Sequence, residues 1–278
     1  MTRQTALGVL AAVWTCLLVL LLFEAQPGSG ASPGVRYVST DGVDAGNCSS
    51  ISGRCRTVQY AINQAAWLDE VHISGGVYTR AGTVARIISS VTLVGGYDPG
   101  FSHVSPADHP TILDAQSGGS VIGVDGPAEV MLAYLTLQHG DGTGACYGAD
   151  YGCGGGIRAH GPDLDLAVQA CVVTANVASR TRFGLGGGIY MRDGNLDLVY
   201  GRVLSNTASA ATVGSAGYGY GGGVYLENGS VWLDGSEIRA NLGAVAVEGH
   251  GGGVALLRVT TAEIHDSTIR ANRATAAA

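Results

Sequence analysis

The chain has 278 residues, of which 45 are glycine, 46% are apolar and 13% are charged. Glycine is about twice as frequent as in average proteins and has no collagen period, so the composition indicates many short strands joined by tight turns. All 15 basic residues are arginine, and 22 acidic residues give a net charge of −7. No basic cluster is present, which argues against nucleic acid as a partner.

The N-terminus carries a segment that is typical of export. Arg3 is followed by an apolar run from Ala6 to Phe23, and the later tripeptide Ser29-Gly30-Ala31 resembles a cleavage site. The pattern predicts a signal peptide over residues 1–31, with an uncleaved anchor as the alternative. Either outcome places the rest of the chain in the periplasm, at the cell surface or in the extracellular space. No later stretch is apolar for long enough to span a membrane.

Removal of that segment leaves five cysteines, and export favours disulfides. The short loops CSSISGRC and CYGADYGC favour the pairs Cys48–Cys55 and Cys146–Cys153. A metal site is the rival hypothesis, but neither pair has Cys-x-x-Cys spacing or nearby histidines. Cys171 is left without a partner.

A repeat becomes visible when the chain is aligned with itself. Gly-x-Gly-Gly-Gly followed by Ile or Val occurs at residues 152–157, 184–189, 217–224 and 249–254. Each copy is followed by a hydrophobic-x-x-Asn tetrapeptide that ends at one of four asparagines: Asn176, Asn206, Asn241 and Asn272. The unit has a body of about 20 residues and a variable loop, which is typical of a stacked solenoid.

Alignment on the asparagines predicts which side chains face inward. Apolar residues recur at fixed distances before each Asn, as at Leu166, Val168 and Val173, and this alternation marks strands with one buried face. The Cys171 slot holds only small residues in all copies, so we predict a buried side chain and not a nucleophile. Equivalent residues stack at the strand spacing, so the four asparagines should form a ladder of hydrogen-bonded amides.

These motifs resemble known repeats. GG-x-[IV] paired with hydrophobic-x-x-Asn resembles the repeats of chlamydial polymorphic outer membrane proteins and, more broadly, right-handed parallel β-helices of the pectin-lyase type. The stretches YVSTDGVDAGNC, CRTVQYAINQAA and DEVHISGGVYT resemble the opening of secreted bacterial β-helix proteins. The resemblance implies an all-β, right-handed parallel β-helix whose N-terminal end is capped by a short amphipathic helix over residues 57–66. The cap and first rung would occupy residues 32–88 and the further rungs residues 89–278.

This fold hosts lyases, hydrolases, adhesins and surface scaffolds, so it does not predict an activity. Polygalacturonases carry Asn-Thr-Asp, Asp-Asp, Gly-His-Gly and Arg-Ile-Lys motifs, and here only Gly-His-Gly is present. The His250 slot holds Cys153, Leu185 and Tyr220 in the other copies, so we interpret it as permissive and not catalytic. Pectate lyases need clustered acids for Ca²⁺ and an Arg or Lys base, and the repeats show no such convergence.

Two outward faces are candidates for ligand binding. After the glycine run, stacking aligns Tyr190 with Tyr225 and Arg192 with Glu227, beside the variable loops that often line the binding face of solenoids. A second set combines an aromatic ring, two carboxylates and an imidazole: Trp232, Asp234, Glu263 and His265. Both sets also fit an ordinary solvated face with ladder stacking and ion pairs.

The loops contain two weak candidates for a cation site. These are GDGTG at residues 140–144 and the segment with Asp41, Asp44 and Asn47, both of which are rich in ordinary turn formers. Neither has the ligand density of a Ca²⁺ loop, so we predict no cofactor, with Ca²⁺ as the weaker alternative.

The sequence therefore predicts an exported scaffold that binds a glycan or a cell surface, with a polysaccharide lyase or glycoside hydrolase as the alternative. An enzyme would break its repeat at a few rungs to bring acids and bases together, whereas this chain keeps its pattern. The chain stops at IRANRATAAA, directly after the fourth Asn. We expect further rungs, an active site or a surface anchor beyond Ala278, since an uncapped solenoid exposes sheet edges.

Overall fold

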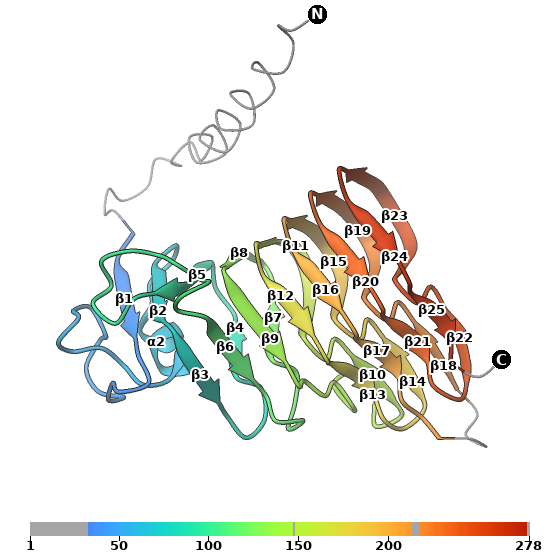
Figure 1. The fold of residues 1–278 in the computed structure, drawn as a ribbon, viewed down its shortest axis with the longest axis horizontal. Coiled ribbons are helices and arrows are strands. Elements are labelled where there is room, and N and C mark those ends of the chain that lie inside the picture. Colours follow the sequence, from blue (N-terminus) through green and yellow to red (C-terminus); the bar gives the residue numbers. More distant parts are fainter. Residues whose placement is uncertain (1–32, 147, 213–216, 277–278) are drawn as a thin grey trace, which may run out of the picture. The chain divides into compact units, whose positions relative to one another are not determined.

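The computed structural model describes residues 33–146, 148–212 and 217–276. In this part of the chain the strands stack in parallel sheets, and each later turn of the chain adds one strand to each sheet (Figure 1). The predicted all-β parallel β-helix with a short helix is confirmed. The predicted signal segment, residues 1–31, lies outside the described residues. Among the described helices, none has the length and apolarity needed to cross a membrane.

Two sheets enclose the core. The long sheet has ten strands: β1 (Val35–Val38), β2 (Glu70–Ser74), β4 (Ala85–Ile87), β5 (Val91–Tyr97), β7 (Ile122–Asp125), β8 (Ala128–Ala133), β11 (Ile157–Gln169), β15 (Ile189–Val199), β19 (Val224–Asp234) and β23 (Val254–His265). The second sheet has seven strands: β3 (Gly76–Thr79), β6 (Thr111–Asp114), β9 (Leu135–Gln138), β12 (Val172–Thr174), β16 (Arg202–Leu204), β20 (Glu237–Arg239) and β24 (Thr268–Arg270).

Two smaller sheets of four strands each are formed by the later rungs. The third sheet contains β13 (Val177–Ser179), β17 (Thr207–Ser209), β21 (Leu242–Ala244) and β25 (Arg273–Thr275). The fourth sheet contains β10 (Tyr151–Cys153), β14 (Phe183–Leu185), β18 (Tyr218–Tyr220) and β22 (Glu248–His250).

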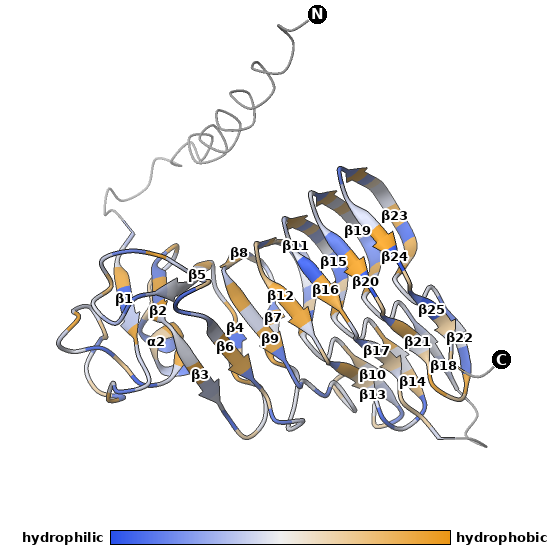
Figure 2. Ribbon diagram, viewed as in Figure 1, coloured by the Kyte–Doolittle hydropathy of each residue, from blue (hydrophilic) through white to orange (hydrophobic). Residues whose placement is uncertain are grey.

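The observed strand register agrees with the alignment on the asparagines. Leu166 pairs with Leu196, which pairs with Val231, so equivalent residues of successive rungs lie above one another. These side chains are buried in one continuous core. Figure 2 shows apolar residues recurring on successive strands of the stack. In the last described rung, the equivalent positions Ile264 and Ile269 are exposed.

The helix α2 (Val58–Gln64) packs against the N-terminal end of the core. The hydroxyl of Thr57 accepts a hydrogen bond from the backbone N–H of Tyr60 and caps the helix. The residues of α2 that are buried are Val58, Ala61 and Ile62. The helix ends before the predicted limit at residue 66 because Ala65 adopts an extended backbone conformation.

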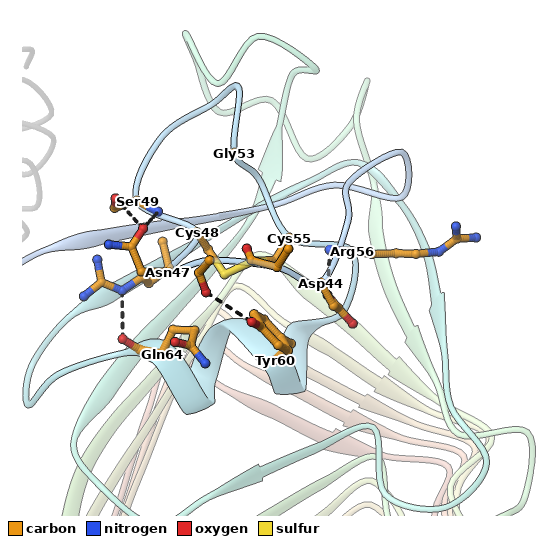
Figure 3. Close-up of a disulfide and its surroundings, with 12 residues drawn as sticks. Asp44, Asn47, Cys48, Ser49, Gly53, Cys55, Arg56, Tyr60 and Gln64 are labelled. Carbon is orange, nitrogen blue, oxygen red and sulfur yellow. Dashed lines mark hydrogen bonds between the residues drawn. A yellow bond between two sulfur atoms is a disulfide. The ribbon is translucent and has the colours of Figure 1, made fainter.

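The cysteines are arranged as predicted. Cys48–Cys55 closes the loop that precedes α2 (Figure 3), and Cys146–Cys153 ties the loop before β10 to that strand. Cys171 is free and buried, and burial raises the pKa of its thiol to about 12. A buried thiol that stays protonated is a poor nucleophile, so its role is structural.

The four asparagines form a ladder through the core. The Nδ2 group and the backbone N–H of Asn176 both donate to Oδ1 of Asn206, each at 3.0 Å. The same pair of bonds joins Asn206 to Asn241 and Asn241 to Asn272. Nδ2 of Asn206 also donates to the carbonyl of Val173 in the preceding rung, at 2.9 Å. The buried amides are therefore satisfied, and an unpaired amide at this depth would be costly.

Among the turns of each rung that use a left-handed backbone, two belong to the repeat motif itself. The residue before each Asn has a positive φ, as at Ala175 and Ser205. The first residue of each glycine run also has a positive φ, as at Gly154 and Gly186. The asparagine ladder stabilises the first turn, and glycine removes the steric cost of the second.

Replacing Asn206 with alanine should lower the free energy of unfolding by about 2–4 kcal/mol, because buried groups of the neighbouring rungs lose their partners. Urea denaturation followed by circular dichroism measures the change. Asn195→Ala is the matched control, since Asn195 is exposed and its amide bonds to Asp165 across the surface. The control should cost less than about 0.5 kcal/mol. Equal costs for the two variants would contradict the role assigned to the ladder.

Candidate functional site

The segment after each Asn leaves the main coil and returns as a second layer. It forms a strand of the third sheet and then a strand of the fourth, and these two sheets pack against each other (Figure 1). A Cβ atom at Gly184 or Gly219 would overlap the carbonyl oxygen of Ala208 or Gly243, respectively. This close approach explains the first glycine of Gly-x-Gly-Gly-Gly. The residues directly before and after this glycine point away from the third sheet, because side chains alternate along a strand.

Two rows of side chains therefore follow the face of the fourth sheet that is turned away from the third sheet. The residues before the first glycine form one row: Tyr151, Phe183, Tyr218 and Glu248. The residues after it form the other row: Cys153, Leu185, Tyr220 and His250. Since the strands are in register, both rows run along the stack.

The predicted ligand residues Tyr190 and Tyr225 lie beneath the second row. They point away from the main core, as expected, and their rings are parallel with centroids 5.7 Å apart. However, the side chains are only 1% and 5% exposed, because they pack in a separate cluster with Cys153 and Leu185. The expectation that Tyr190 lies on an open face is wrong. The returning strands of the fourth sheet cover it.

A groove of about 570 Å³ lies where the fourth sheet meets the long sheet. The fourth sheet contributes most of the lining: Tyr151, Leu185, Tyr218 and Tyr220. The long sheet contributes Tyr225, Glu227 and residues 255–257. We call this feature the tyrosine groove. Its volume is in the range of small-ligand sites, and its lining combines apolar surface with a few polar groups.

Aromatic rings of the tyrosine groove stack on aromatic residues beside it, along the direction of the stack. The ring centroids of Tyr151 and Phe183 are 4.6 Å apart, as are those of Phe183 and Tyr218. Tyr220 stacks on His250 at 4.6 Å. Because neighbouring rings cover much of each other's faces, the row offers mainly ring edges and hydroxyl groups. Burial raises the pKa of Tyr218 to about 12, so its hydroxyl stays protonated at neutral pH.

The charged pair predicted for this face lies at the edge of the tyrosine groove. Arg192 and Glu227 are register neighbours on β15 and β19. Nε of Arg192 donates to Asp193 at 3.1 Å. Glu227 forms an ion pair with Arg258 at 3.6 Å and accepts a hydrogen bond from the hydroxyl of Tyr225 at 3.5 Å. Glu227 is thus a polar group of the groove that is already partly neutralised.

The second predicted set is brought together on the outer face of the long sheet. Trp232 is paired in register with Glu263, and Asp234 with His265. The ring of Trp232 stacks on His265 at 4.5 Å, and His265 contacts Glu263 at 3.3 Å. One face of the indole is therefore covered, which leaves less aromatic surface for a ligand than the sequence suggested.

The tyrosine groove includes residues that the sequence analysis did not select. His250 was interpreted as occupying a permissive slot, and two residues of that slot in other rungs, Leu185 and Tyr220, line the groove. His250 lies 3.0 Å from Glu248 and stacks on Tyr220. The available signal was the aromatic residue three positions before the glycine run in three copies: Tyr151-Gly-Cys, Phe183-Gly-Leu and Tyr218-Gly-Tyr.

The weak cation-site candidates are engaged in other contacts. Asp41 forms an ion pair with Arg54, and the carboxylate of Asp44 accepts hydrogen bonds from Thr57. Asp141 pairs with Arg180. Within the described part of the chain, no group of three or more His, Cys, Asp or Glu residues is placed to hold a metal ion.

Comparison with protein-family models, with curated proteins and with solved structures found no match to this chain. The assignment of stacked parallel sheets therefore rests on the strand pairing in the structure and not on a relative. The likeness to pectin-lyase-type and chlamydial repeats stays a resemblance of short motifs.

Asp197 gives a prediction that depends on pH. Although Asp197 lies on the exposed face of the sheet, partial desolvation by its surroundings and the nearby Asp165 raise its pKa, so the folded protein holds this proton more tightly than the unfolded chain. The ionised carboxylate therefore destabilises the fold at pH 7, and the penalty is absent below the ordinary pKa of 3.8. Asp197→Asn should raise the melting temperature at pH 7 by on the order of 1 °C, with no gain at pH 3.

The matched control is Asp125→Asn, for which the sign should be opposite at pH 7. Although burial acts to raise the pKa of Asp125, the Arg158 charge and the hydrogen bond from Arg86 lower it overall. Differential scanning calorimetry of both variants checks the pair. A loss of stability in Asp197→Asn at pH 7 would contradict the assignment.

Proposed function

We propose that this protein is an exported β-helix scaffold that binds a carbohydrate in the tyrosine groove. The observation that carries the proposal is the group of four tyrosines that lines the groove beside apolar residues of neighbouring rungs: Tyr151, Tyr218, Tyr220 and Tyr225. The stacked sheets hold these groups at a regular spacing, so little side-chain entropy would be lost on binding. A ligand in the groove would lie along the axis of the stack.

The chemistry of the groove lining suits a sugar. Sugars present both C–H surfaces and hydroxyl groups, and tyrosine offers an apolar ring with a polar end. Tyr218 and Tyr220 can donate and accept hydrogen bonds, and Glu227 adds an acceptor. Leu185 and residues 255–257 supply apolar contact. A neutral glycan is favoured over a polyanion because the protein has a net charge of −7.

Binding fits the groove better than hydrolysis does. Glycosidases flank the scissile bond with two carboxylic acids. Among the described residues that line the tyrosine groove, Glu227 is the one acid, and it pairs with Arg258. A lyase or hydrolase stays the alternative function, and it predicts product formation from a polysaccharide.

Location outside the cytoplasm is part of the proposal. The two disulfides fit an oxidising environment, since such bonds are rare where thiols are kept reduced. The apolar N-terminal segment supports export through a signal peptide or anchor. The motif resemblance to bacterial surface and secreted β-helix proteins supports a role at the cell surface.

A glycan array probed with the purified protein tests the proposal, followed by calorimetry with the best ligand. Tyr218→Phe removes one hydroxyl and should weaken binding about two- to tenfold. Tyr220→Ala removes a groove wall and should weaken it more than about tenfold. Trp232→Ala is the matched control, because Trp232 is an aromatic residue outside the groove, and its affinity should be unchanged.

An array without any bound glycan would reject the carbohydrate ligand. Equal weakening by Trp232→Ala and Tyr220→Ala would reject the tyrosine groove as the site. Incubation with pectate, alginate and related polymers in the presence of Ca²⁺ tests the enzyme alternative, and release of products would support it over a pure scaffold.

A further inference from the structure

A second cavity lies at the N-terminal cap, at the opposite end of the chain from the tyrosine groove. It has a volume of about 450 Å³ and is bounded by α2, by β3 and by the loop after β1. Its wall is rich in polar side chains: Thr40, Arg56, Thr57, Asn63, Thr79 and Arg80. We call it the cap cavity. It has room for a molecule of about monosaccharide size.

The arginines of the cap cavity differ from the others in their ionic partners. Among the described residues, each arginine except Arg56, Arg80 and Arg273 forms an ion pair with an aspartate or glutamate. This is notable in a chain where acids outnumber arginines, 22 to 15. Two of the three exceptions, Arg56 and Arg80, line the same cavity. The third, Arg273, lies in β25, far along the stack.

The guanidinium groups of these two arginines retain donors for a ligand. Arg80 donates to the side-chain oxygen of Gln59 at 3.5 Å and to the carbonyl of Thr83 at 3.3 Å, which are both neutral acceptors. The side chain of Arg56 extends away from the Cys48–Cys55 disulfide (Figure 3). A guanidinium carries five N–H donors and binds oxyanions through paired hydrogen bonds.

The acid in the cavity wall is occupied by the local backbone. One oxygen of Asp44 accepts hydrogen bonds from the backbone N–H groups of Arg56 and Thr57, both at 2.9 Å. Its other oxygen accepts from the hydroxyl of Thr57 at 2.8 Å. Asp44 therefore serves to hold the turn before α2, and its acceptors are directed at that turn and not at the guanidinium groups.

We infer that the cap cavity binds a small oxyanion-bearing molecule through Arg56 and Arg80. The ligand class is a phosphate, sulfate or carboxylate group on a body of about monosaccharide size. The hydroxyl and amide groups of Thr40, Thr79 and Asn63 would contact the uncharged body. This site is separate from the tyrosine groove and does not depend on the function proposed for it.

Isothermal titration calorimetry with four probes tests the inference: glucose 6-phosphate, inorganic sulfate, glucuronate and glucose. At least one of the three anionic probes should bind at low ionic strength, and the strongest identifies the oxyanion. Neutral glucose should not bind at this site. Arg56→Gln and Arg80→Gln should each weaken the anionic probe about tenfold, since each removes a charge-assisted hydrogen-bonding group.

Arg273→Gln is the matched control, because Arg273 also lacks an acidic partner but lies outside the cavity. This variant should bind the probe with the same affinity as the unchanged protein. Melting curves confirm folding of each variant. The Arg80→Gln variant loses the hydrogen bond to Thr83 and could disturb that turn. In that case the Arg56→Gln variant alone tests the site. Tyr218→Phe should leave this binding unchanged, which separates the outcome from that of the tyrosine groove.

Two results would overturn the inference. One is the absence of heat from all three anionic probes with the unchanged protein. The other is unchanged affinity for an anionic probe in the Arg56→Gln/Arg80→Gln double variant.

Discussion

The turn held by the buried asparagines is the constraint on which the rest of the structure depends. Each side-chain amide bonds to the next rung and to the preceding one, so Asn176, Asn206 and Asn241 set both the turn and the spacing of the stack. The strands on either side are then in register, and their apolar faces merge into one core. Because an amide buried without partners would be costly, the chain cannot slip by a residue without losing the ladder.

The third and fourth sheets form a layer outside that core, and their close packing depends on glycine. The third and fourth sheets lie so close together that only glycine fits at positions such as Gly184 and Gly219. The flanking side chains therefore point away from the third sheet, and Tyr151, Tyr218 and Tyr220 among them line the tyrosine groove. The same layer covers Tyr190 and removes it from solvent. A repeat that serves backbone packing therefore also decides which aromatic groups remain available to a ligand.

Most arginines of the described chain form ion pairs with aspartate or glutamate. Outside the cap cavity, every described arginine except Arg273 pairs with a carboxylate, as Arg202, Arg239 and Arg270 do around Glu237. Such pairs on an exposed sheet contribute little to stability individually, but they neutralise the surface and leave few free cations. The two arginines of the cap cavity depart from this rule in a concave site, which is why they carry the inference of a ligand.

The sequence by itself determined the repeat, the inward positions, the asparagine ladder and the disulfide pairs. These features follow from spacing along the chain, which strand periodicity and stacking translate directly into contacts. Only the tertiary structure decided that Tyr190 is covered, that Leu185 and Tyr220 line a groove, and that Arg56 and Arg80 share a cavity. These outcomes depend on the path of the variable loops. Burial at these positions is decided by which sheet covers which, and the local periodicity of the sequence contains no information about that.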